Sequence, residues 1–110
     1  MTVNEPMSFL MAGYIGGIHA PFERLVNPED FRTVPAELTK NVLLAHGRAV
    51  EAIRAHAVLP PHVGMALNGD CYFPWEETEE GIRKAREKTF SEEQSFTGIR
   101  WWADPMILGT

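Results

Sequence analysis

The chain opens with Met1-Thr2-Val3-Asn4-Glu5-Pro6, in which a short apolar run leads into an amide, a carboxylate and a proline. Proline has no N–H to donate to a sheet, and it disfavours a helical backbone at the residue before it. We therefore expect a β-strand that ends at Asn4 and Glu5, with Glu5 in an extended conformation. An amide beside an acid at the rim of a sheet would suit a functional site. The alternative is a surface glutamate in an extended N-terminal segment.

The segments after this strand alternate between helical and extended patterns. Residues 6–15 predict a short and largely buried helix, because proline is tolerated in a first helical turn. Residues 20–35 indicate a loop, and residues 36–57 predict the clearest helix of the chain. Its apolar stripe comprises Leu38, Val42, Ala45, Ala49, Ala52 and Ile53. Gly47 inside this helix suggests close packing against a neighbour.

A second extended segment lies at residues 63–67, an apolar run without alternation that is typical of a strand buried on both faces. Thr78 predicts the N-cap of a polar helix from Glu79 to about Glu93, and residues 99–103 predict a last helix. The order strand, helix, strand, helix implies a parallel sheet with helical crossovers. Two strands cannot close such a sheet. We therefore expect an α/β fold, namely a fragment of a (β/α)8 TIM barrel, whose full length is typically about 250 residues.

Composition narrows the functional classes. At 110 residues, with 45% apolar and 23% charged residues, the chain has room for one globular domain at most. A net charge of −5 without a basic cluster gives no reason to expect a nucleic-acid partner, and no apolar run suggests a membrane partner. The single Cys71 excludes an internal disulfide and is expected to be a small buried hydrophobe. The histidines lack metal-ligand spacing, so no metal or cofactor is expected.

Five motifs follow one another along the chain. They are Thr2-Val3-Asn4-Glu5-Pro6, Gly17-Ile18-His19-Ala20-Pro21, the run 43–50, the run 63–68, and Trp101-Trp102-Ala103-Asp104-Pro105 with Gly109. In this order they resemble glycoside hydrolase family 1, the β-glucosidase and 6-phospho-β-glycosidase family. The resemblance covers essentially the whole chain. It implies that residues 1–110 are a partial catalytic barrel, from the end of strand four through strand five and the fifth helix, with no complete domain.

The resemblance also implies roles for individual residues. In a retaining β-glycosidase acting on β-glucosides or similar small glycosides, Glu5 would be the general acid/base. Asn4 would hydrogen-bond the sugar 2-hydroxyl, and Asn68 would contact the aglycone. His19 would lie near the mouth of the pocket as an aglycone contact, or equally serve as a hydrogen-bonded structural residue. The family's nucleophile, in a Glu-Asn-Gly motif, is not among these residues. Most members of the family are cytoplasmic, so the resemblance also implies a cytoplasmic location.

Some positions depart from the family or leave alternatives open. Met7 stands where an aromatic residue commonly follows the Asn-Glu-Pro triplet, and the segment 69–75 is less typical. Its aromatic residues Tyr72, Phe73 and Trp75 could form a stacking wall for a sugar, but we expect them to pack within the core of the loop. His46, on the long helix, is expected to be packed and hydrogen-bonded.

Two other functions compete with a glycosidase. The chain could be a non-catalytic α/β module that binds a sugar or protein partner through its aromatic loop. It could also be one half of a split barrel that pairs with a complementing barrel chain. Both ends look truncated, because the chain opens in mid-strand and stops without a polar tail. We therefore expect a piece of a larger protein, and no turnover by this piece alone.

Overall fold

The computed structural model of the chain describes residues 1–91 and 96–109 and is mostly helical. Its helical elements are α1 (Pro6–Leu10), η1 (Met11–Ile15), α2 (Asp30–His56), α3 (Glu79–Thr89) and α4 (Ile99–Ile107). The chain divides into two compact units, Met1–Leu67 and Asn68–Thr110. In the described part, no helix is both long enough and apolar enough to cross a membrane.

The predicted helix at residues 6–15 is confirmed, but its second half is wider than an α-helix. The expectation that it is largely buried is wrong, because Phe9 is 41% and Met11 40% exposed. Pro6 occupies the first turn of α1 and is buried, and Leu10 is completely enclosed. In η1, which is a π-helix, the Gly16 N–H donates to the Met11 carbonyl at 2.8 Å, five residues back. The Ala12 carbonyl is then available to the loop that follows, where it accepts from the N–H groups of residues 18 and 19.

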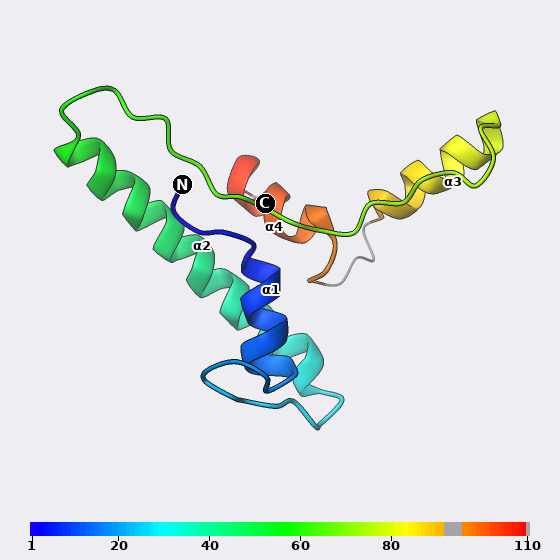
Figure 1. Cartoon of the computed structure of the whole chain (residues 1–110), viewed down its shortest axis with the longest axis horizontal. Coiled ribbons are helices and arrows are strands. Elements are labelled where there is room, and N and C mark those ends of the chain that lie inside the picture. Colours follow the sequence, from blue (N-terminus) through cyan, green and yellow to red (C-terminus); the bar gives the residue numbers. More distant parts are fainter. Residues whose placement is uncertain (92–95, 110) are drawn as a thin grey trace. The chain divides into compact units, whose positions relative to one another are not determined.

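The long helix α2 lies beside α1 in the first unit (Figure 1). It begins at Asp30, so the prediction that it starts after Pro35 was wrong. The Asp30 N–H donates to the Asn27 carbonyl at 3.1 Å, and the Asn27 amide donates to the Asp30 carboxylate at 3.0 Å. These contacts start the helix before Pro35, which is buried inside it. The C-terminal end at His56 lies close to the predicted end.

The first extended segment pairs in parallel with the second. Asn4 and Ala66 form a parallel bridge. The Thr2 N–H donates to Gly64 at 2.9 Å, that of Glu5 to Ala66 at 2.8 Å, and that of Ala66 to Val3 at 3.0 Å. The predicted parallel pairing is therefore confirmed. The prediction of a strand buried on both faces is wrong, because Gly64 is exposed and its neighbours at 63 and 65–67 are half-buried. Among the described residues this pairing is one isolated bridge, and no third segment pairs with either side of it. A parallel strand that is buried on both faces needs such neighbours.

The second unit is held by another parallel bridge, between Asp70 and Gly98. The Asp70 N–H donates to the Thr97 carbonyl at 3.0 Å. A side chain at Gly69 would place its Cβ 2.8 Å from the Ile99 nitrogen, so glycine is required for this approach. The last helix is confirmed as α4 and extends to residue 107, with Trp102 completely enclosed and its indole N–H donating to the Phe96 carbonyl at 2.8 Å.

The polar helix α3 begins as predicted, at the Thr78 cap, whose hydroxyl accepts from the Gly81 N–H at 3.1 Å. It ends at Thr89, so the predicted extension toward residue 93 was wrong; residue 93 itself lies outside the described part. The buried Thr89 hydroxyl accepts from the Tyr72 N–H at 2.9 Å and lies 2.8 Å from the Ala85 carbonyl. These bonds tie the end of the helix to the aromatic loop.

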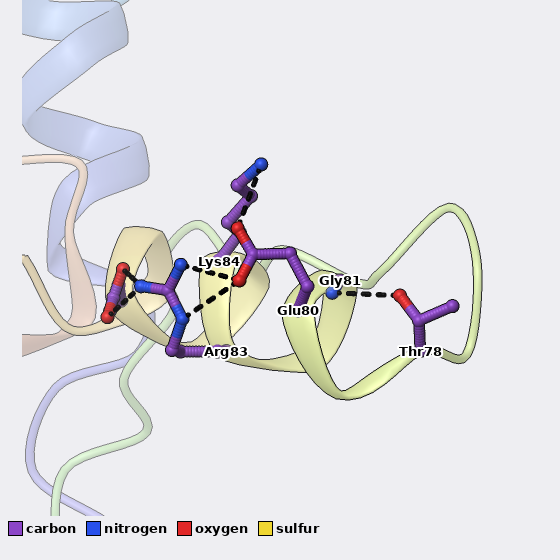
Figure 2. Close-up of polar contacts among 6 residues, drawn as sticks. Thr78, Glu80, Gly81, Arg83 and Lys84 are labelled. Atoms are coloured by element: carbon purple, nitrogen blue, oxygen red, sulfur yellow. Dashed lines mark hydrogen bonds and ion pairs between the residues drawn. The ribbon is translucent and has the colours of Figure 1, made fainter.

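Acidic and basic side chains pair across the turns of α3 on its surface. Figure 2 shows Arg83 and Lys84 reaching the carboxylate of Glu80, at 2.7 Å and 3.1 Å. Arg83 also pairs with Glu87 at 2.7 Å. The Arg83 guanidinium, and after it Lys84, holds the pKa of Glu80 below its ordinary value. All of these side chains are exposed, so the pairs support the helix only modestly.

The substitution Gly81→Ala tests the close approach between the first turn of α3 and the residues that precede it, and Gly47→Ala is the matched control. A Cβ at Gly81 would overlap the Glu76 carbonyl oxygen, whereas one at Gly47 meets nothing within 4 Å. The expected close packing at Gly47 is therefore wrong. Gly47→Ala should raise the free energy of unfolding by up to about 1 kcal/mol. Gly81→Ala should lower it by about 1–3 kcal/mol, because the backbone must shift. Urea unfolding followed by far-UV circular dichroism measures both, and two changes of the same sign would contradict this account.

A peptide spanning residues 72–91 tests the Glu80 pairs. Because the pKa of Glu80 is lowered in the helix, its contribution is present above the unfolded-state pKa and is lost as pH falls through the lower helical value. Helix content should therefore fall on acidification from neutral pH to below about pH 3. Glu80→Gln should lower helix content at neutral pH and weaken this pH dependence. Glu79→Gln, which removes one charge from the same first turn, should keep the dependence; equal effects of the two would disprove the pairing.

Candidate active site

Asn4 and Glu5 lie where the first extended segment gives way to α1, and both side chains are exposed. Glu5 is the N-cap of α1 and its backbone is left-handed, with φ 44° and ψ 64°. The expected extended conformation was therefore wrong. The Glu5 N–H donates to the Ala66 carbonyl of the parallel pair, whereas the Glu5 carbonyl already accepts from the Ser8 N–H of the helix, at 2.9 Å. The chain therefore changes from extended to helical within this one residue. A non-glycine residue pays roughly 1–2 kcal/mol for this conformation, and such residues are frequent at functional sites.

The Glu5 carboxylate is held by the first turn of the helix that it caps. The Ser8 hydroxyl donates to Glu5 Oε2 at 3.1 Å. Because the backbone on both sides of Glu5 is tied by hydrogen bonds, the carboxyl group starts from a defined position at the end of the parallel pair. A carboxyl group in this position can give a proton to, or take one from, a molecule bound at that end.

Behind Asn4 and Glu5, the extended segment is attached to α2 through a side chain. Thr2 Oγ1 lies 2.6 Å from Nδ1 of His46, and both residues are half-buried. The expectation that His46 is packed and hydrogen-bonded is therefore confirmed. The partner of His46 was not found from the sequence, because a separation of 44 positions leaves no local signal of the contact.

His19 lies in a turn that is docked on the last turns of the first helical segment. The N–H groups of Ile18 and His19 both donate to the Ala12 carbonyl, at 2.8 and 3.0 Å, and the His19 carbonyl accepts from Phe22 at 2.7 Å. The imidazole itself is exposed. Ala12 lies seven positions after Glu5, so the turn is anchored roughly 10 Å along the helix axis from the backbone of Glu5. The structure thus places Asn4, Glu5 and His19 in one unit, at opposite ends of one short helix.

Asn68 is the first residue of the second unit and is half-buried. The aromatic loop that follows it is more exposed than expected: Trp75 is 99% exposed and Phe73 84%. Cys71, expected to be buried, is exposed as well. The loop packs against α3 at Gly81, where Pro74 and the Glu76 carbonyl approach the helix closely. The rings of Phe73 and Trp75 face solvent, so the prediction that they pack within the loop was wrong.

A cavity of about 450 Å³ is lined by residues of this loop and of α3. Its lining includes Tyr72, Phe73, Trp75, Thr78, Lys84 and Lys88. The Lys88 ammonium lies 4.2 Å from the centroid of the Tyr72 ring, a cation–π contact. The two lysines were not predicted, although their spacing of four positions on a helix places them on one face.

The described residues offer no metal centre: in residues 1–91 and 96–109, no group of three or more His, Cys, Asp and Glu side chains could hold a metal ion. In the first unit, the candidate site residues are the carboxyl group of Glu5, the adjacent amide of Asn4 and the imidazole of His19. An amide and exposed aromatic rings are added by the second.

Comparison with known proteins gives a consistent result. The model of glycosyl hydrolase family 1 matches residues 1–110. The chain is 33% identical over 115 residues to Beta-glucosidase 1B of Phanerodontia chrysosporium, covering 99% of this chain and 20% of that protein. It is 37% identical over 108 residues to Beta-glucosidase A of Acetivibrio thermocellus, covering 98% and 21%. It is 32% identical over 116 residues to the furostanol glycoside 26-O-beta-glucosidase of Hellenia speciosa, covering 99% and 19%. The chain spans about a fifth of the length of these curated relatives.

Gly13→Ala tests how the His19 turn is held. A Cβ at Gly13 would lie 2.7 Å from the Ala20 carbonyl oxygen and must displace the turn. We expect the amides of Ile18 and His19, which bond Ala12, to exchange with solvent about tenfold faster in amide-exchange NMR. Gly64→Ala adds a Cβ to the same unit in open space and is the control. Unchanged exchange in Gly13→Ala would show that the turn does not depend on this contact.

Proposed function

This chain belongs to glycosyl hydrolase family 1, and from that premise we propose that it is the part of a retaining β-glucosidase that carries the general acid/base, Glu5. The proposed substrates of the complete protein are β-glucosides or similar small glycosides. The relatives named above, all β-glucosidases by name, support this substrate class. A cytoplasmic location of the complete protein is part of the same proposal.

One observation carries the assignment of Glu5. Asn4 forms a parallel bridge, and Glu5 follows it directly at the point where the chain turns into α1. In (β/α)8 barrels the catalytic side chains come from the carboxyl ends of parallel strands, where each strand passes into its helix. Glu5 therefore has both the residue type and the topological position of a catalytic acid. Its left-handed backbone adds to the case, because the chain holds a costly conformation at this residue.

The proposed chemistry needs two carboxyl groups about 5 Å apart. One attacks the anomeric carbon and forms a covalent glycosyl-enzyme, while the other protonates the departing oxygen. Glu5 takes the second role and then removes a proton from the water that hydrolyses the intermediate. The attacking carboxylate belongs to a part of the relatives that this chain does not span. On this proposal the 110 residues alone give no turnover.

Asn4 is the proposed partner of Glu5 in binding the sugar. The amide oxygen can accept a hydrogen bond from the 2-hydroxyl, and that bond strengthens as positive charge develops at the anomeric carbon, because the hydroxyl becomes a better donor. Its place in the bridge with Ala66 holds its backbone while the side chain stays exposed. We assign His19 and Asn68 to the aglycone side of the complete site. Their exposed or half-buried positions are compatible with a contact to substrate.

A second function is favoured by one observation in the second unit. Trp75 and Phe73 present nearly fully exposed rings beside a cavity of about 450 Å³. A non-catalytic module that stacks a sugar on these rings would use them directly. Saturable binding of glucosides by the 110-residue chain, lost in Trp75→Ala but kept in Glu5→Ala, would favour this alternative. If this chain is instead one half of a split barrel, it should bind the complementing barrel chain rather than a glucoside.

Glu5→Ala in the complete protein tests the proposed role. A general acid matters most when the leaving group is poor, so hydrolysis of an alkyl glucoside should slow by about 10²–10⁴-fold. Cleavage of an activated dinitrophenyl glucoside should slow far less at the step that releases the phenolate. Glu37→Ala, which removes an exposed acid from α2, should leave both rates unchanged. Equal losses for the two substrates in Glu5→Ala would rule out the acid/base role.

A further inference from the structure

The Thr2 hydroxyl joins three segments of the first unit. It lies 2.6 Å from Nδ1 of His46 on α2 and 3.3 Å from the Gly64 carbonyl oxygen. The Thr2 N–H donates to the same Gly64 carbonyl at 2.9 Å. These partners lie 44 and 62 positions away in the chain. One side chain therefore connects the segment that carries Asn4 and Glu5 both to its pairing partner and to the long helix.

The geometry makes the imidazole the main partner of this hydroxyl. A hydroxyl has one proton to donate, and 2.6 Å is a short hydrogen bond whereas 3.3 Å is a long one. If Thr2 donates to His46, the imidazole proton is on Nε2. If Thr2 instead donates to Gly64, the imidazole must donate from Nδ1. In either arrangement one hydrogen bond joins the Thr2 hydroxyl to Nδ1 of His46, so the contact exists for both tautomers.

The parallel pair needs such an attachment because it is short. Its backbone bonds are those of Thr2, Glu5 and Ala66, around a single bridge. A slip of one residue would turn every side chain of the segment to the other face. Asn4 and Glu5 would then exchange directions. The helix α2, with 27 residues, is the longest element described and a rigid support for the attachment.

We propose that His46 is a positioning residue that holds the register of the pair through Thr2 and thereby orients Asn4 and Glu5. This inference rests on the proposed function for the importance of that orientation, but not for the contact itself. His46 acts through Thr2, since the hydrogen bond of its ring is with the Thr2 hydroxyl and not with Asn4 or Glu5.

Amide exchange of the 110-residue chain, resolved by NMR, tests the proposal without reference to turnover. The reporters are the N–H groups of Glu5 and Ala66, which bond across the pair. Thr2→Val and His46→Leu should each speed exchange of both reporters about fivefold to tenfold, while amides in the middle of α2 keep their rates. The double variant should be no faster than either single one, because the two substitutions remove the same bond.

Conservative and control variants separate positioning from general packing. Thr2→Ser keeps the hydroxyl, and His46→Asn places a polar side-chain atom where the imidazole Nδ1 lies, so both should restore slow exchange. His56→Leu removes an imidazole of α2 that bonds its own helix, to the Ala52 carbonyl, and should leave both reporters unchanged.

Three results would overturn the proposal. Unchanged reporters in Thr2→Val and His46→Leu would show that the backbone bonds alone set the register. Faster exchange throughout α2 would show that His46 serves general packing. Reporters that exchange at the free-peptide rate in the unsubstituted chain would show that the pair is not held. None of these results depends on the leaving-group test of Glu5, so failure of this proposal can be distinguished from failure of the proposed function.

Discussion

The parallel pairing of residues 2–5 with residues 64–66 is the constraint on which the first unit depends. Its backbone bonds bring together segments that lie 62 positions apart. The entropic cost of closing so long a loop grows only slowly with length, and much of the loop is ordered as α2, about 40 Å of helix. Once this pair exists, Glu5 must turn sharply into α1. The position of the candidate acid follows from that turn.

Close backbone approaches at glycine are the second theme of the structure. At Gly13, Gly69 and Gly81 an added Cβ would collide with a carbonyl or an amide of another segment. Each approach positions a different part of the chain: the His19 turn, the second parallel bridge and the cap of α3. In the sequence these residues look the same as Gly47 and Gly64, which face open space. Glycine content alone therefore does not reveal which positions are structurally required.

Membership in glycosyl hydrolase family 1 gives the two units a common context. The chain corresponds to about a fifth of the length of its β-glucosidase relatives, and a (β/α)8 barrel distributes its catalytic groups over many strands. A stretch of this size can contribute an acid/base and part of a binding wall.

Local features of the chain were predictable from the sequence, because they depend on neighbouring residues. The proline at the start of α1, the Thr78 cap of α3 and the existence of α2 and α4 follow from such short-range rules. The parallel pairing and the family resemblance were also readable, since both rest on the order of motifs. The left-handed Glu5, the early start of α2 and the outward rings of Phe73 and Trp75 were not. Nor was the Thr2–His46 contact. These were decided by tertiary structure, because each depends on which distant segments come close enough to share hydrogen bonds or to exclude a side chain.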